Sequence, residues 1–521
     1  MTRHRGICLP LSSMPSSTSW GIGEIPDLAP MARWLETAGC DQLMLLPVGT
    51  MAEGEASPYS ACSAMAIDPI YLSLSAIEDF VRGGGVEQLP LDARQTLVRV
   101  MKSPAVRFAE VRRLKSQALW SAFERFVSDE WNNRTVRAGA FAAFASKERW
   151  WLHDYALFQA CAAEWPGGSW QDWPEAIARR EPAALAEARR HFARRILFEQ
   201  YGQWIADLQW QQARRLSKTV GVSLFGDLPF VVDTHSADVW SRQGEFLTEV
   251  SVGVPPDAFS DTGQDWGLPM YRWDVVHQTD FAWLRQRARR MASLYDGFRV
   301  DHLVGFYRTY GKAPTGERFF LPSDEPTQAW QGERAIRAFV ESGVDVVAED
   351  LGTVPDFVRA SIAQLGVGGY KVLRWERHWH LPGRPFASPS EYPARSVATT
   401  GTHDTEPMAV WWDEAAPADR HALAEVLHRA GIAAVDPGVP WSDGLRDAIL
   451  RLMATAASNH LFFPIQDVFG WRDRINTPAT VGDHNWTWRL PWTVDEWLSR
   501  PDTCERAAYL RSVASPASER R

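Results

Sequence analysis

The stretch GFRVDHL at residues 297–303 is an apolar run that leads directly into charged residues, and seven similar runs recur along the chain. They lie at residues 6–11, 41–48, 221–229, 344–352, 370–375, 396–404 and 460–470. Short, mostly apolar runs are typical of parallel strands that are buried on both faces. Most of them follow a helical pattern, as residues 26–38 precede the second run. Eight such units predict an α/β fold, a (β/α)8 TIM barrel.

The uneven spacing of the runs predicts large additions to this barrel. A long, helix-rich stretch separates the second run from the third, so we expect a helical insertion at residues 80–218. A second gap, rich in Gly, Pro, Asp and Trp, predicts long rim loops at residues 230–295, on the C-terminal face of the barrel. Since no internal repeat is present, we expect residues 1–521 to form a single catalytic domain that carries both additions.

Composition and charge exclude several classes of protein. The 521 residues carry 55 Lys and Arg against 64 Asp and Glu, a net charge of −9, which argues against nucleic acid or an anionic membrane as the main partner. The five cysteines are scattered without a CxxC pair, so a zinc ribbon is not expected and a reducing compartment is favoured. The apolar stretch at residues 7–11 is too short for the core of a signal peptide, and no run of 18 apolar residues exists. We therefore expect a cytoplasmic protein without a metal site.

Acidic residues follow three of the predicted strands directly. Asp301 ends the fourth strand, Glu349 the fifth and Asp404 the seventh. The carboxyl ends of barrel strands form the active-site face, so these three carboxylates are expected to share one concave surface. For Asp227, Asp350 and His302 taken singly, a structural role such as a helix cap or an ion pair is an equally good interpretation.

Such a set of carboxylates suits the cleavage of a glycosidic bond. One carboxyl group protonates the leaving oxygen and a second attacks or stabilises the anomeric carbon, at a separation of about 5–5.5 Å in retaining enzymes. Arg299 lies two residues before Asp301, on the same side of the strand, and would keep Asp301 ionised as a nucleophile. Glu349 would need a raised pKa to act as the acid, which crowding among carboxylates would provide.

Longer motifs resemble a known family. The segments 57–74, 226–240, 255–274, 348–352 and 466–490 are similar to the 4-alpha-glucanotransferases of the alpha-amylase clan, also called amylomaltases or disproportionating enzymes. The resemblance covers residues 6–490. It implies a retaining transfer of an α-1,4-glucan segment to the 4-hydroxyl of an acceptor glucan or glucose through a covalent glycosyl-aspartate. It also implies α-1,4-glucans and maltooligosaccharides as partners and no cofactor; no pattern indicates the oligomeric state.

The resemblance also implies a role for each matching residue. Asp301 corresponds to the nucleophile, Glu349 to the general acid and base, and Asp404 to the carboxylate that holds hydroxyl groups of the distorted sugar. Contacts to the sugar at the reacting position, or to its charge, are implied for Arg299, His302 and His403. Further glucan-contacting positions are Ser57, Tyr59, Asp227, Asp350 and Asn476. Residues 253–273 resemble a lid, on which Asp257, Gln264 and Trp266 would contact the acceptor.

Some positions depart from the family's usual residues, and other interpretations stay open. The departures are Asp68, Ala258, Leu268, Leu303-Val304, Tyr370 and Thr405-Glu406-Pro407, which leave the three carboxylates intact. An α-1,4-glucan hydrolase of the same clan would use the same carboxylates, whereas a silent glucan-binding protein would not need them. A tryptophan cluster in the insertion is predicted to be core rather than a remote glucan site; its members are Trp150, Trp151, Trp165, Trp170 and Trp173.

Overall fold

The computed structural model describes residues 2–52, 54–256, 263–478, 480 and 482–514. Its centre is a closed barrel of eight parallel strands in the order β1-β12-β11-β10-β9-β6-β3-β2. The strands are β1 (His4–Leu9), β2 (Gln42–Leu45), β3 (Ser223–Leu228), β6 (Gly297–Val300), β9 (Asp345–Ala348), β10 (Gly368–Val372), β11 (Ser396–Thr399) and β12 (His460–Pro464). Each of the eight apolar runs forms one of these strands, so the prediction of a (β/α)8 barrel is confirmed.

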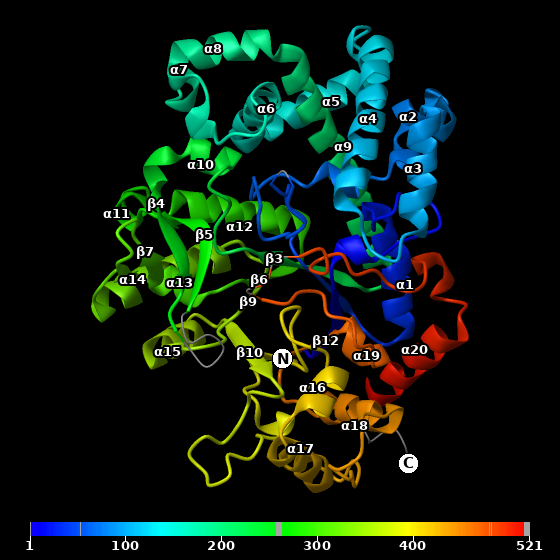
Figure 1. Cartoon of the computed structure of the whole chain (residues 1–521), viewed down its shortest axis with the longest axis vertical. Helices are drawn as coiled ribbons and strands as arrows, with labels where there is room; N and C mark the ends of the chain where they lie inside the picture. The colour runs from blue at the N-terminus through cyan, green and yellow to red at the C-terminus, as the bar shows by residue number, and fades with distance from the viewer. Residues whose placement is uncertain (1, 53, 257–262, 479, 481, 515–521) are drawn as a thin grey trace.

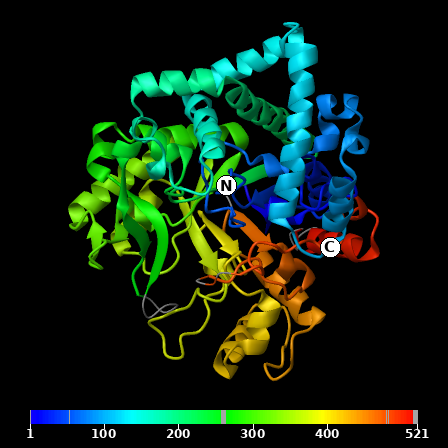
Figure 2. The same ribbon diagram turned by 45° about the horizontal axis from the view of Figure 1, so that its top comes forward.

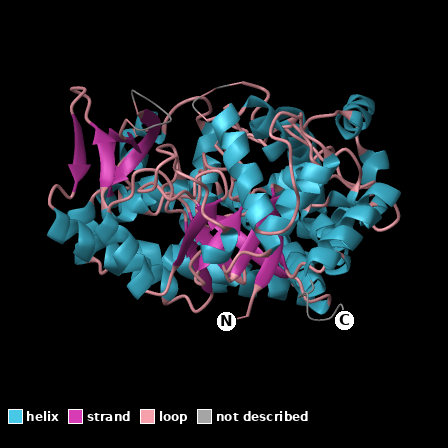
Figure 3. Ribbon diagram, turned by 90° about the horizontal axis from the view of Figure 1, so that it is seen from below, coloured by secondary structure: helices cyan, strands magenta, loops and turns pink. Residues whose placement is uncertain are grey.

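Helices surround this barrel, as Figure 3 shows from below. Those that alternate with its strands are α1 (Leu28–Thr37), α9 (Ala193–Thr219), α12 (Ala282–Leu294), α14 (Glu325–Val340), α15 (Asp356–Gln364), α16 (Met408–Glu414), α17 (Pro417–Arg429), α18 (Asp443–Ala454) and α19 (Ile465–Phe469). The C-terminal α20 (Pro501–Ala514) packs beside α1, although the two lie far apart in the sequence (Figure 1). Among the described residues, we find no helix that is both long and apolar enough to cross a membrane.

The strands are apolar throughout because both of their faces are buried. Six side chains, each from a different strand, fill the inside of the barrel: Met44, Phe225, Val347, Tyr370, Val397 and Phe462. Side chains that point outward join a larger core beneath the helices, as Ile7 and Phe298 do. Glycine is required where these layers meet closely, since a Cβ on Gly297 would lie 2.3 Å from the ring of Phe225. The close packing explains why these segments carry short, nearly unbroken apolar runs.

A group of helices between β2 and β3 rises above one side of the barrel (Figures 1 and 2). It consists of α2 (Glu78–Arg82), α3 (Leu91–Lys102), α4 (Phe108–Phe126), α5 (Val136–Lys147), α6 (Arg149–Glu164), α7 (Glu175–Ala178) and α8 (Pro182–His191), and α9 connects it to β3. Of the clustered tryptophans, Trp151, Trp170 and Trp173 are buried, and Trp150 and Trp165 are partly buried against the same core.

The segment expected to form rim loops contains regular structure instead. Residues 230–295 include α10 (Ala237–Ser241), β4 (Phe246–Val254), β5 (Gln264–Tyr271), α11 (Trp273–Gln278) and the barrel helix α12. Strands β4 and β5 join β7 (Thr309–Lys312) and β8 (Arg318–Leu321) in an antiparallel sheet of the order β5-β4-β7-β8. The sequence of β5, QDWGLPMY, carries Gly and Pro, which are depleted in strands. The sequence pattern therefore did not indicate a strand here.

Candidate active site

A cleft of about 1360 Å³ opens at the carboxyl ends of the barrel strands. Its walls include most of the residues that the sequence marked as candidates: Ser57, Tyr59, Gln264, Trp266, Arg299, Asp301, His302, Glu349, His403, Asp404 and Asn476. Asp301 and Glu349 follow the neighbouring strands β6 and β9, in which Val300 pairs with Ala348. Asp404 follows β11, two strands further round the barrel. The topology therefore brings the three carboxylates to one concave surface.

Arg299 is the central cation of this surface. Its guanidinium group, almost fully buried, lies 2.7 Å from Asp301 Oδ1 and 2.7 Å from Asp227 Oδ2. The hydroxyl of Tyr59 donates a second hydrogen bond to Asp227 Oδ2, at 2.6 Å. Arg299 is thus shared between Asp301 and Asp227, and the hydrogen bond from Tyr59 to Asp227 helps to hold the guanidinium in place. An ionised carboxylate in contact with the cleft can act as a nucleophile.

Glu349 lies in a different environment from its neighbour Asp301. Burial and the negative charge of Asp301 raise the pKa of Glu349 from 4.5 to about 7, against the opposing effect of Arg299. The backbone N–H of His302 donates to Glu349 Oε2 at 2.9 Å, and the N–H of Leu351 donates to Oε1 at 3.1 Å. His302 has a left-handed backbone with φ of 43°, next to Asp301 in the chain. A carboxyl group with this pKa can both give and take a proton near neutral pH.

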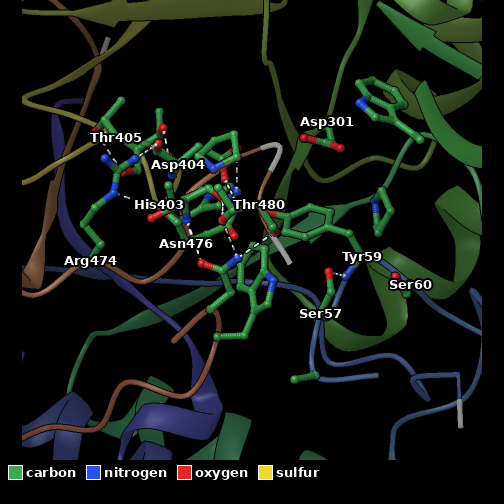
Figure 4. Close-up of a pocket in the computed structure, with 18 of the residues that line it drawn as sticks. Ser57, Tyr59, Ser60, Asp301, His403, Asp404, Thr405, Arg474, Asn476 and Thr480 are labelled. Atoms are coloured by element: carbon green, nitrogen blue, oxygen red, sulfur yellow. Dashed lines mark hydrogen bonds and ion pairs between the residues drawn. The ribbon is translucent and has the colours of Figure 1, made fainter. Parts of the chain in front are cut away.

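Asp404 is held in place by three neighbours (Figure 4). Asn476 Nδ2 donates to its Oδ1 at 2.6 Å, and His403 Nε2 lies 3.3 Å from its Oδ2. Arg474 donates to the backbone carbonyl of Asp404 at 2.8 Å. Burial disfavours ionisation of Asp404, but the attraction of His403 and the hydrogen bonds outweigh it, so the pKa of Asp404 lies well below its usual value. The pKa of His403 is raised, because the attraction of Asp404 exceeds the effect of burial.

Aromatic and imidazole rings form the other walls of the cleft. The ring of Trp266 on β5 meets that of His302 edge-on at 4.9 Å, and its indole N–H donates to Gln264 Oε1 at 3.1 Å. Burial lowers the pKa of His302 to about 4, so its imidazole is neutral at pH 7. The antiparallel sheet thus brings an indole to the rim close to Asp301. Of the residues expected on the lid, Asp257 lies outside the described residues.

Two of the expected glucan-contacting residues stand behind the surface of the cleft. Asp227 is enclosed by Arg299 and Tyr59, as described above. The carboxylate of Asp350, 4% exposed, accepts hydrogen bonds from Arg359 Nη1 at 2.6 Å and from the N–H of Tyr370 at 2.7 Å. Both aspartates therefore support other residues in this structure rather than line the cleft.

Among the lining residues that were not sequence candidates, four charged or aromatic side chains lie close to the candidates. Arg374 and Glu406 form an ion pair at 2.5 Å, and Glu406 also lies 3.7 Å from Arg474. Trp486 completes this side, where its ring contacts Tyr59. Arg474 and Trp486 lie within the motif at residues 466–490, so the motif marked the segment without separating these side chains from their neighbours. Nothing local in the sequence indicates the pairing of Arg374 with Glu406.

The arrangement supplies the groups that acid–base chemistry on a glycoside requires. The cleft carries one carboxylate paired with a guanidinium, one carboxyl group that titrates near neutral pH and one carboxylate held as an anion. Within the described parts of the chain, no group of three or more His, Cys, Asp or Glu side chains is arranged to hold a metal ion. Carboxyl groups of these kinds can transfer protons and attack an electrophilic carbon.

Comparison with known proteins points to one enzyme family. The family model described as 4-alpha-glucanotransferase matches residues 9–494. The 4-alpha-glucanotransferase of Thermus thermophilus is 32% identical over 544 aligned residues that cover 100% of this chain and 99% of that protein. The enzyme of the same name from Synechocystis is 31% identical and covers 95% of this chain and 96% of its own.

A solved structure supports the same fold. The amylomaltase of Streptococcus agalactiae, in complex with acarbose, superposes with a TM-score of 0.82 at 24% identity and covers 99% of both chains. The family model spans nearly the whole chain, and the Thermus thermophilus enzyme aligns with all of it. This protein therefore belongs to the 4-alpha-glucanotransferase family.

Proposed function

We propose that this protein is a 4-alpha-glucanotransferase that disproportionates maltooligosaccharides. Asp301 attacks the anomeric carbon of an α-1,4-linked donor while Glu349 gives its proton to the departing oxygen. The C–O bond of the donor breaks, a bond to the Asp301 carboxylate forms, and the shortened glucan leaves with its new hydroxyl group. Glu349, now ionised, takes a proton from the 4-hydroxyl of an acceptor glucan, whose oxygen displaces Asp301.

The observation that carries this proposal is the contrast between Asp301 and Glu349. One carboxylate is paired with a buried guanidinium, and the adjacent one has a pKa of about 7. A nucleophile must be ionised and a general acid must be protonated at the same pH, and a guanidinium beside Asp301 with a raised pKa on Glu349 supports this division of roles. Asp404, held as an anion by Asn476 and His403, would accept hydrogen bonds from sugar hydroxyls as positive charge develops on the ring.

Transfer rather than hydrolysis requires that an acceptor reach the intermediate before water does. Exchanging one α-1,4 bond for another scarcely changes the free energy, so the outcome is decided by relative rates. Trp266 lines the cleft at its rim, where a flat indole can hold an acceptor sugar and displace water. We therefore assign Gln264 and Trp266 to the acceptor side. A hydrolase of the same clan is the second candidate, since the carboxylates serve either reaction.

Incubation with maltotriose tests the proposal. Chromatography over time should show free glucose together with a ladder of maltooligosaccharides longer than the substrate. The Asp301→Asn variant keeps the shape of the nucleophile without its charge and should abolish the ladder. Glucose and maltose without longer products would instead identify a hydrolase. An inactive wild-type protein that still binds maltotriose would identify a silent glucan-binding protein.

A further inference from the structure

Trp486 has a backbone conformation that bulky residues avoid. Its φ of 66° lies in the left-handed region, in which the Cβ atom of an L-residue crowds the backbone. Among the described non-glycine residues with positive φ, Trp486 and His302 are the two that line the cleft. Such a conformation persists only where the surrounding structure determines it. The surrounding structure therefore determines where the ring of Trp486 lies.

Hydrogen bonds join Asn485 and Trp486 to the described residues Ile475, Thr477 and Thr480. The N–H of Trp486 donates to the carbonyl of Ile475 at 2.7 Å. The buried amide of Asn485 accepts from the N–H of Thr477 at 2.9 Å and donates to the carbonyl of Thr480 at 3.0 Å. These bonds bring Trp486 back to the segment that carries Asn476, the donor to Asp404. The strained residue Trp486 is thus connected by hydrogen bonds to the segment whose Asn476 supports Asp404.

The indole of Trp486 contacts two rings that hold carboxylates. Its centroid lies 5.6 Å from that of Tyr59 and 5.8 Å from that of His403, and those two rings stack on each other at 5.2 Å. Tyr59 donates to Asp227, and His403 pairs with Asp404. The contact between His403 and Asp404, 3.3 Å long, does not by itself fix the imidazole tightly. Packing against the rings of Trp486 and Tyr59 restrains the imidazole further.

We propose that Trp486 is a positioning residue for glucan transfer, whose ring braces the stack of Tyr59 and His403 and so holds Asp404 in its reactive orientation. The inference rests on the proposed function, because it concerns the transition state of that reaction. It predicts that the ring matters for rate, whereas the left-handed backbone matters for stability. Two variants without the ring separate these effects, since glycine adopts a positive φ without strain and alanine does not.

The test compares Trp486→Ala, Trp486→Gly and Trp486→Phe in the maltotriose assay and by thermal unfolding. The Ala and Gly variants should each lose about 100-fold in kcat/KM, mostly through kcat, as expected when a misplaced group no longer fits the transition state. The Gly variant should melt at a higher temperature than the Ala variant. The Phe variant should recover most of the activity. Trp488→Ala is the control, because that neighbouring indole packs on Trp471 and does not line the cleft.

The results that would overturn the inference are specific. An Ala variant with wild-type kcat/KM would show that the ring positions nothing. If Trp486→Gly is both more stable and more active than Trp486→Ala, the role of Trp486 is purely structural. If the wild-type protein fails to disproportionate maltotriose, the proposed function fails as well. An active wild type with an active Ala variant removes this inference alone.

Discussion

Replacing Glu349 with glutamine should make the protein more stable at high pH and nearly inactive on maltotriose. Burial and the charge of Asp301 raise the pKa of Glu349 from 4.5 to about 7. At 1.36 kcal/mol per pKa unit, this rise corresponds to roughly 3 kcal/mol of preference for the protonated form. Glutamine resembles that neutral form at every pH. The variant therefore avoids the cost of burying a charge in the folded state.

The pH dependence of the stability shows whether ionisation of Glu349 causes the difference between the two proteins. Unfolded Glu349 ionises near pH 4.5 and the folded side chain near pH 7, so wild-type stability falls across this interval and levels off above it. The free energy of unfolding of Glu349→Gln, relative to wild type, should thus increase by roughly 3 kcal/mol between pH 4 and pH 8. The amide cannot accept from the N–H groups of both His302 and Leu351, which subtracts about 1 kcal/mol at every pH.

Urea unfolding at several pH values measures this difference, and the half-exposed Glu333→Gln serves as a control. In the maltotriose assay, Glu349→Gln should be nearly inactive because the leaving oxygen receives no proton. With α-maltosyl fluoride, whose fluoride leaves unprotonated, the first step should survive. A stability difference that is the same at pH 4 and pH 8 would refute the reasoning. So would equal losses of activity on maltotriose and on the fluoride.

Three further variants test other parts of the site. Trp266→Ala should raise the ratio of hydrolysis to transfer on maltotriose. An unchanged ratio would show that the indole does not favour the acceptor sugar over water. Asn476→Ala removes the 2.6 Å bond to Asp404, so kcat/KM should fall about 10- to 100-fold; an undiminished rate would contradict this. Arg359→Ala leaves the buried carboxylate of Asp350 without its ion-pair partner and should cost about 1–2 kcal/mol in urea unfolding, because Arg359 itself is partly exposed; an unaltered midpoint would argue against the pair.

The barrel could be predicted from the sequence because its strands are buried on both faces. This burial produces short apolar runs, and a closed parallel sheet then places the following residues at one rim. Asp301, Glu349 and Asp404 could be expected at that rim, since each follows a run directly. The antiparallel sheet has no such signature: β5 carries Gly and Pro, and two of its other strands, β7 and β8, have only four residues each.

The depth of individual side chains could not be predicted. Asp227 and Asp350 also lie near the ends of predicted strands, as the carboxylates in the cleft do. Each, however, pairs with an arginine from another part of the chain and lies behind the cleft surface. Arg359 approaches Asp350 from α15, and Gly369 leaves the space that this carboxylate occupies, since a Cβ there would lie 2.6 Å from it. Such pairing is decided by distances between helices and strands, which local sequence does not encode.

The electrostatics of the cleft also suggest how one residue serves both steps of the proposed reaction. The charge of Asp301 is one of the causes that raise the pKa of Glu349. Formation of the bond to the sugar removes that charge, while Arg299 keeps its own. The pKa of Glu349 must then fall, because a repelling neighbour is lost and an attracting one remains. Glu349 is thus an acid when a proton must be given and becomes ionised when an acceptor hydroxyl needs a base.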